Sequence, residues 1–268
     1  MTTANLSTAT TSFDAMPPGP LGASLHYAVR TATLTLKTWS YVLFTIGMPV
    51  ILYLVFNGLW GSQPIAPGVN YSAIIMVQMA AYGALGAAMS GGAVIALERR
   101  SGWFRQLMIT SLPPRSFLIA RSAVVLSLVL PSLILVFTAG FVFGGVRAPV
   151  SAWVVSLLLM WAALAPLAIL GLVIGLWVRG EAVQGLTTLI LLLLSLAGGL
   201  WFPAEMMPPL MQTTAKFLPS YWIAEFGRWP FLAGPFPWLG VLVLAVWAVV
   251  LVFVGALGYR RAARNSKR

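Results

Sequence analysis

Six long runs of apolar residues, separated by shorter polar segments, follow one another along this chain of 268 residues. They cover approximately residues 39–60, 71–97, 116–143, 151–178, 182–202 and 237–258. Each run is long enough to cross a hydrocarbon layer of about 30 Å as a helix that rises about 1.5 Å per residue. The pattern therefore predicts an all-α integral membrane protein with six transmembrane helices.

Prolines and small residues modify this pattern inside the predicted spans. Proline occurs within the first, third and fourth spans, at Pro49, Pro131 and Pro166. Membrane helices tolerate such prolines because neighbouring helices satisfy the freed carbonyl groups. The second span carries small residues at four-residue steps, namely Gly83, Ala87 and Gly91. This spacing predicts a ridge on which another helix packs closely.

Three segments outside the runs have patterns of their own. Residues 1–20 are polar and end in PPGP, which predicts a disordered cytosolic tail. Residues 21–37 place apolar side chains at helical spacing and predict an amphipathic helix that lies in the lipid headgroup plane. Residues 203–236 are rich in aromatic residues but too broken by proline to span. They predict one or two short re-entrant helices on the extracellular side.

Composition and charge support the membrane assignment and orient the chain. Only 8% of the residues are charged, 16 of them basic and five acidic. If the N-terminus is cytosolic, the predicted external loops contain only Arg147, Lys216 and Arg228. The remaining basic residues lie on the cytosolic side: Arg30, Lys37, Arg99, Arg100, Arg105, Arg115, Arg121, Arg179, Arg260, Arg261, Arg264, Lys267 and Arg268. The positive-inside rule then places both termini in the cytosol. We expect the protein to lie in the inner (plasma) membrane.

This orientation divides the chain into the tail, a membrane domain over residues 21–260 and a basic cytosolic tail over residues 261–268. The basic residues cluster at the ends of the spans and form no basic stripe with interleaved aromatic residues. We therefore expect no nucleic-acid partner despite the formal net charge of +11.

The residues needed for catalysis or ion coupling are scarce. The chain has no cysteine and one histidine, His26, which predicts no disulfide and no metal site. All five acidic residues fall in loops or near span ends: Asp14, Glu98, Glu181, Glu205 and Glu225. No lysine follows a glycine, so the phosphate-binding loop ending in Gly-Lys-Ser/Thr does not occur. These features argue against an intramembrane enzyme and against an ion-coupled carrier.

The loop after the second span, ERRSGWFRQLMITSLPPR at residues 98–115, combines basic and large apolar side chains. As a helix, it would gather Trp103, Phe104 and Leu107 on one face and end at Pro113. The residues alone leave two interpretations open. The segment is a basic loop resting on the membrane, or it is a helix on which a soluble partner docks.

The start of this segment resembles the permeases of type-2 ABC exporters, which are six-span subunits of ATP-binding-cassette transporters. The similar residues are Glu98-Arg99-x-x-Gly102, followed by Leu107, Thr110 and Leu112-Pro113. The resemblance extends over essentially the whole chain after the tail, including the re-entrant stretch with Leu218-Pro219-Ser220-Tyr221-Trp222. Arg100 departs from the pattern, since an acidic residue is common at that position.

The resemblance implies a division of labour between subunits. Residues 98–113 would be the coupling helix seated against a separate ABC ATPase, and residues 21–37 the connecting helix. The residues implied in coupling are Glu98, Arg99, Arg100, Gly102, Trp103, Arg105, Leu107 and Pro113. Two ATPase copies would bind ATP and Mg²⁺, so this chain needs no cofactor. Two permease chains, identical or paired with a sister chain, would form a pathway lined mainly by their first, second and fifth spans.

The cargo is predicted only by class. Met76, Gln78, Met79 and Tyr82 of the second span are candidate pathway residues, because polarizable and aromatic side chains suit a hydrophobic or amphipathic drug, antibiotic or lipid. Ordinary helix packing explains each of them equally well. Glu205 and Glu225 would attract cationic cargo at the exit or merely solvate a loop. Alternatives are a polysaccharide or glycolipid export permease, a membrane anchor or immunity protein that does not transport, and a secondary carrier.

Overall fold

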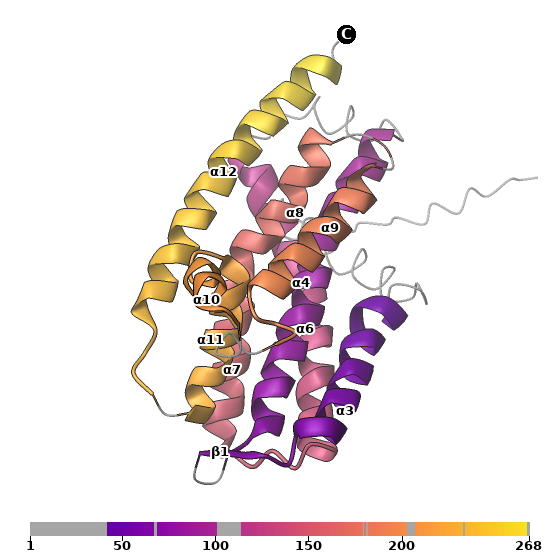
Figure 1. Cartoon of the computed structure of the whole chain (residues 1–268). Helices are drawn as coiled ribbons and strands as arrows, with labels where there is room; N and C mark the ends of the chain where they lie inside the picture. The colour runs from indigo at the N-terminus through magenta and orange to yellow at the C-terminus, as the bar shows by residue number, and fades with distance from the viewer. Residues whose placement is uncertain are drawn as a thin grey trace, which may run out of the picture.

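A computed structural model describes residues 42–66, 69–100, 114–178, 180, 182–202, 207–232 and 234–266. The predicted tail at 1–20, the predicted connecting helix at 21–37 and residues 101–113 of the predicted coupling helix lie outside these ranges. The described residues form a helical bundle with a small hairpin at one end and the end of α12 at the other (Figure 1). We call these the hairpin end and the C-terminal end.

The helices occur in the same order along the chain as the predicted apolar runs. They are η1 (Leu43–Gly47), α3 (Met48–Trp60), β1 (Pro64–Ala66), β2 (Val69–Asn70), α4 (Tyr71–Arg100), α6 (Pro114–Val142), α7 (Val150–Ala163), α8 (Ala165–Trp177), α9 (Ala182–Ala197), α10 (Pro209–Ala215), α11 (Pro219–Leu232) and α12 (Trp238–Ser266). The strands pair antiparallel, with Pro64 opposite Asn70. The basic segment predicted as a tail from residue 261 continues α12 as helix to Ser266.

Four of the six predicted spans are long and apolar enough to cross a membrane: Tyr71–Ala96, Arg121–Val142, Val150–Trp177 and Trp238–Arg261. The predicted fourth span is divided at Leu164 into α7 and α8, with Pro166 in the first turn of α8. Proline is tolerated there because the first turn of a helix leaves its N–H groups without intrahelical partners. The chain is therefore an all-α, multi-pass membrane protein.

The other two predicted spans form shorter apolar helices, Thr45–Trp60 and Ala182–Ala197. The predicted span 182–202 was too long, because α9 ends at Ala197. Gly199 adopts a left-handed φ of 74°, and the Leu200 N–H donates to the Ser195 carbonyl at 2.9 Å. This is the hydrogen-bonding pattern with which glycine commonly ends a helix. Leu200 and Trp201 therefore leave the helix axis although they continue the apolar run.

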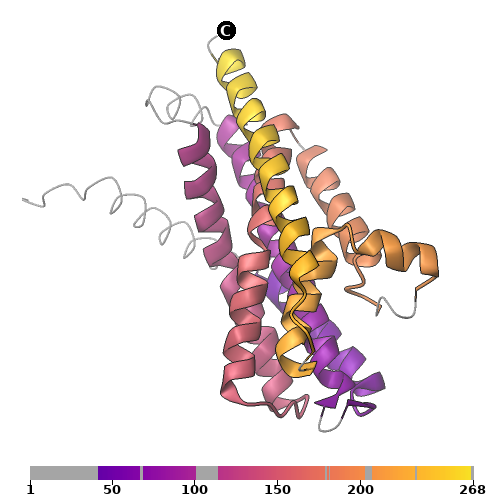
Figure 2. The ribbon, with the colours of Figure 1, turned by 90° about the vertical axis from the view of Figure 1, so that its left-hand side faces the viewer.

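The predicted re-entrant region contains α10 and α11. Helix α9 stops part of the way along the bundle, and α10 then lies crosswise beside it (Figures 1 and 2). Helix α11 continues to the hairpin end and buries one side against α7 and α4. Two serine hydroxyls hold it in place, since Ser156 Oγ donates to the Gly227 carbonyl at 2.8 Å and Ser220 Oγ to the Leu194 carbonyl at 2.7 Å.

Helix α4 is the centre of the bundle and α12 lies at its edge. An apolar stretch of 18 residues in α4, long enough to cross a membrane, is 89% buried. The corresponding stretch of α12 is 22% buried. Small residues allow α4 to contact α3, α6, α8, α9 and α11. The exposed side of α12 carries Leu242, Val249 and Phe253, a surface suited to lipid contact.

Candidate functional site

Two cavities lie end to end along one side of α4. The first, which we call the C-end groove, occupies about 680 Å³ in the half of the bundle nearer the C-terminal end. The second, the hairpin-end cavity, occupies about 660 Å³. Both volumes fall within the range of about 300–1,000 Å³ typical of small-molecule sites.

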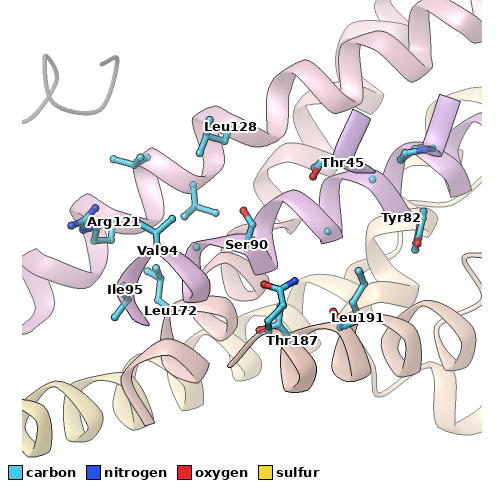
Figure 3. Close-up of a pocket in the computed structure, with 18 of the residues that line it drawn as sticks. Thr45, Tyr82, Ser90, Val94, Ile95, Arg121, Leu128, Leu172, Thr187 and Leu191 are labelled. Atoms are coloured by element: carbon cyan, nitrogen blue, oxygen red, sulfur yellow. The ribbon is translucent and has the colours of Figure 1, made fainter. Parts of the chain in front are cut away.

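The C-end groove has α4 as its floor and η1, α3, α6 and α9 as its walls. Arg121, Val94 and Ile95 lie at one end of it, and Tyr82 and Leu191 at the other (Figure 3). Ser90 and Thr187 lie between them (Figure 3). Aliphatic side chains and glycines make up most of the remaining lining: Met48, Pro49, Gly83, Gly86, Gly91, Val124, Val125, Leu128 and Leu172. A mainly apolar surface with a few polar groups suits an amphipathic ligand.

The hairpin-end cavity is bounded by the opposite half of α4 together with α3, β1 and α11. Its lining is aromatic and aliphatic, with Trp60, Tyr71 and Trp201 among its members. Glu225 and Arg228, one turn apart on α11, form an ion pair in its wall. The carboxylate considered for attracting cationic cargo is therefore compensated by a neighbouring guanidinium.

An aromatic pair lies where the two cavities adjoin, and we call this place the constriction. Tyr82 lines the C-end groove and Trp201 lines the hairpin-end cavity, and their rings meet edge to face with centroids 5.8 Å apart. Beside this pair, Gln78 Nε2 donates a hydrogen bond of 3.0 Å to the Gly199 carbonyl. The constriction thus joins α4 to the turn that ends α9. The buried Trp201 indole N–H has no hydrogen-bond partner within the described ranges.

The four predicted pathway residues divide into two pairs. Gln78 and Tyr82, one turn apart, face the cavities at the constriction. Met76 and Met79 are fully buried and are not among the residues that line either cavity. Met76 packs closely against Gly140 of α6. Their thioethers fill the interior of the bundle, as methionine commonly does.

The predicted small-residue ridge lies where α4 meets its neighbours. A Cβ atom on Gly83 would lie 2.6 Å from Pro49 Cγ, and one on Gly91 would lie 2.6 Å from Val125 Cγ2. Ala87 is fully buried. Gly86 differs from these positions, because a Cβ atom there would meet Leu191 at an ordinary contact distance of 3.8 Å.

The predicted coupling residues are placed only in part. Glu98, Arg99 and Arg100 form the last turn of α4, and only their backbone is described. Gly102, Trp103, Arg105, Leu107 and Pro113 lie outside the described residues. The flanking helices show where the segment is attached, since α4 ends and α6 begins toward the C-terminal end of the bundle (Figure 1).

Arg121 and Trp201 are two cavity residues that sequence reasoning did not place there. The charge pattern explains Arg121 by topology alone, yet its side chain is 8% exposed and lines the C-end groove. Trp201 belonged to an apolar run that was interpreted as a transmembrane helix. The Gly198-Gly199 pair before it was the available signal, because paired glycines often end a helix.

Comparison with known proteins gives two matches. The family model described as "ABC-2 type transporter" matches residues 25–232. The chain is also similar to the protein named "Putative transport permease YvfS" of Bacillus subtilis (strain 168), with 26% identity over 221 residues. That alignment covers 82% of this chain and 89% of the relative.

Proposed function

The chain belongs to the ABC-2 type transporter family, and on that premise we propose that it is the permease subunit of an ATP-driven exporter. A separate ABC ATPase, present in two copies, binds and hydrolyses ATP with Mg²⁺. A second permease chain, identical or related, completes the transmembrane pathway. The cargo is a hydrophobic or amphipathic small molecule such as a drug, an antibiotic or a lipid.

The observation that carries this proposal is the line of cavities along α4. Residues from Tyr71 to Ile95 on this helix line first the hairpin-end cavity and then the C-end groove. Helices α3 and α9 flank this side of α4 (Figure 1). The line therefore provides a route along the length of the bundle, and a second permease chain on the same side would enclose it.

The distribution of basic residues supports a direction for this route. The end of α4 lies toward the C-terminal end of the bundle, as do the beginning of α6 and the basic end of α12 (Figure 1). These helix segments carry Arg99, Arg100 and Arg121. The positive-inside rule favours the cytosol for that end. Under the proposal, both termini are cytosolic, cargo enters the C-end groove from the cytosolic side, and the hairpin-end cavity opens to the outside.

Reconstitution tests the transport function. The chain would be co-purified with an ABC ATPase from its own genome and placed in proteoliposomes with three probes that share one alkyl tail, namely dodecyl phosphate, dodecanol linked to a neutral dye, and dodecyltrimethylammonium. We expect ATP to drive at least one probe across the membrane. An ATPase variant that cannot hydrolyse ATP is the control.

Two results would contradict the proposal. Movement of a probe in response to an ion gradient, without an ATPase, would indicate a secondary carrier. The second result is that the chain binds an ATPase, yet ATP moves neither a lipid-linked sugar nor any of the three probes. In that case a non-transporting anchor becomes the better description.

The constriction gives a prediction about coupling. We expect Trp201→Ala to let the probes leak through the complex without ATP, several-fold faster than through the wild type, because the substitution joins the two cavities. A matched control is Trp153→Ala, which removes an indole that packs edge to face on Phe231 at 5.6 Å but lines neither cavity. Leak would be measured as the loss of each preloaded probe from proteoliposomes in the absence of ATP. Equal leak from both variants would show that the Tyr82–Trp201 pair does not block movement between the two cavities.

A further inference from the structure

We propose that the C-end groove selects uncharged amphipathic molecules that carry a carbonyl group, and that Thr187 of α9 determines this selectivity by donating a hydrogen bond to the carbonyl oxygen. The apolar part of the ligand lies between α4 and α9, toward Tyr82. This inference rests on the proposed export function and narrows the chemical class of the cargo.

The hydroxyl group of Thr187 is the observation that carries the proposal. Thr187 is 6% exposed and lines the C-end groove, and its Oγ1 atom is buried without a hydrogen-bond partner among the described residues. A buried hydroxyl that lacks a partner destabilises a folded protein, so its presence calls for a physical reason. Threonine has two accessible χ1 rotamers in a helix, and rotation between them brings the hydroxyl within reach of a ligand in the groove.

Two other hydroxyl groups form the bond that Thr187 does not form. Ser195 Oγ on α9 and Thr138 Oγ1 on α6 each donate to the carbonyl four residues earlier, at 2.7 Å. Serine and threonine within helices commonly satisfy their hydroxyls in this way. Val183 lies at the same spacing before Thr187, but Thr187 Oγ1 forms no bond with its carbonyl. The Thr187 hydroxyl is therefore available to a group outside α9.

The surroundings of Thr187 indicate which polar chemistry fits beside it. Gln184, Thr187 and Thr188 line the groove from one side of α9, at helical spacing, although this helix is otherwise mainly aliphatic. Ser90 of α4 also lines the groove, and it donates to a carbonyl of its own helix at 2.6 Å, which leaves its oxygen as an acceptor. These groups are uncharged, so they suit a ketone, an ester or an amide better than an ion.

The rest of the groove provides space for an apolar chain. Tyr82 and Leu191 lie at one end, beyond Thr187 (Figure 3). A Cβ atom on Gly86 would meet Leu191 at an ordinary contact distance of 3.8 Å, so α4 and α9 leave room between them here. Arg121 is the charged residue among the described lining; it lies at the other end and already interacts within the protein (Figure 3). A hydrogen-bond donor beside an apolar space suits a neutral amphiphile.

Substitutions separate the hydroxyl group from the shape of the groove. Thr187→Val replaces the hydroxyl with a methyl group of similar size, whereas Thr187→Ser keeps it. Gly86→Leu extends a side chain into the groove without meeting backbone, and it should weaken the binding of every ligand. The matched control is Thr138→Val, which makes the same change at an exposed hydroxyl that does not line the C-end groove.

The experiment measures photolabelling of the purified full chain, without an ATPase, in nanodiscs of ether-linked phosphatidylcholine, a lipid without ester carbonyls. The probes are a methyl ketone, an alkane and an alkanoate that share one tritiated alkyl chain with a diazirine. We expect the ketone to reach half-maximal labelling of α4 and α9 peptides at about a fivefold lower mole fraction in the membrane than the alkane, as one net hydrogen bond allows. Thr187→Val should remove this preference, while Thr187→Ser and Thr138→Val should retain it.

The melting temperature distinguishes a binding role of Thr187 from a structural one. Thr187→Val should melt at or above the temperature of the wild type, because no hydrogen bond within the protein is lost. A clearly lower melting temperature would show that the hydroxyl is bonded within the protein, and it would overturn the proposal.

The labelling results decide the rest. The proposal is overturned if the ketone and the alkane label the wild type alike, if the alkanoate labels at a lower mole fraction than the ketone, or if Thr187→Val keeps the preference. It is also overturned if the labelled peptides lie outside α4 and α9. Ester-linked lipid identifies the source of the carbonyl: competition supports a lipid ester, and its absence supports a separate molecule. Because labelling is measured without ATP, failure of the export function would not affect this result.

Discussion

Replacing Gly171 with alanine is expected to lower the free energy of unfolding by about 3 kcal/mol, at the upper end of the cost of overpacking a core. A Cβ atom on Gly171 of α8 would lie 2.8 Å from the carbonyl oxygens of Ala88 and Met89 on α4. These are backbone atoms, so no change of rotamer can relieve the contact. Valine at the same position should prevent the bundle from assembling.

The measurement is the thermal unfolding of the detergent-solubilised protein, followed by tryptophan fluorescence and size-exclusion chromatography. The matched control is Gly185→Ala in α9, where an added Cβ atom has no neighbour within 4 Å. Alanine should leave that helix unchanged or stabilise it by up to about 1 kcal/mol through helix propensity. Equal melting temperatures for Gly171→Ala and the wild type would show that α4 and α8 do not cross as closely as described.

Gly171 is sensitive because it packs closely on α4, and close packing is a property that hydropathy does not report. The hydropathy pattern therefore located the helices but did not show which of them is central. Apolar runs mark a helix whether it is surrounded by protein or by lipid. The pattern treats α4 and α12 alike, yet α4 is almost completely enclosed and α12 is mostly exposed. Small residues such as Gly83 and Ala87 distinguish the central helix, because they permit close approach from several sides.

The ends of helices were predicted less well than the helices themselves, because the backbone conformation of a few residues decides where a helix ends. The run from 182 to 202 is apolar throughout, so hydropathy alone extends the helix to Phe202. The left-handed conformation at Gly199 ends α9 earlier and turns Trp201 toward Tyr82. The constriction therefore exists because a helix stops, which hydropathy does not detect and a glycine pair only suggests.

The four candidate pathway residues lie on α4, which lines both cavities, but on different sides of that helix. Choosing side chains by their chemistry selected Met76 and Met79 together with Gln78 and Tyr82. A helix turns these residues to different sides, and only the packing of α3, α6 and α9 decides which side remains uncovered. Arg121 was missed for a different reason. The positive-inside rule already accounted for its charge, so its position in the groove was not predicted.

The arrangement of α4 would give the predicted coupling segment a physical means of action. Its last turn, which ends at Arg100, leads into residues 101–113, and α6 follows directly at Pro114. Both helices also line the C-end groove. A force applied to residues 101–113 would therefore act on α4 and α6, whose separation sets the width of the groove. Because Tyr82 lies on α4, movement of this helix would also move the constriction.

This means of action predicts that Trp103→Ala weakens ATPase docking and lowers ATP-driven transport. We expect ATP-driven movement of the probes to fall at least about tenfold, because a large aromatic side chain buried at an interface commonly contributes 2 kcal/mol or more to binding. ATPase copurification should fall in parallel, while the thermal stability of the permease stays unchanged. Glu98→Gln should act in the same direction, since it removes the acidic residue that begins the segment.

The matched control is Gln106→Ala, which lies in the same segment but away from the predicted apolar face of Trp103, Phe104 and Leu107. It should retain both ATPase copurification and transport. Pull-down of the ATPase and ATP-dependent probe uptake, measured on the same preparations, separate a loss of docking from a loss of force transmission. If Trp103→Ala retains both activities, the segment is a basic loop resting on the membrane and the ATPase docks elsewhere. If docking survives but transport is lost, the force passes through Trp103 to α4 and α6, and Gly86→Leu should then block transport without affecting docking.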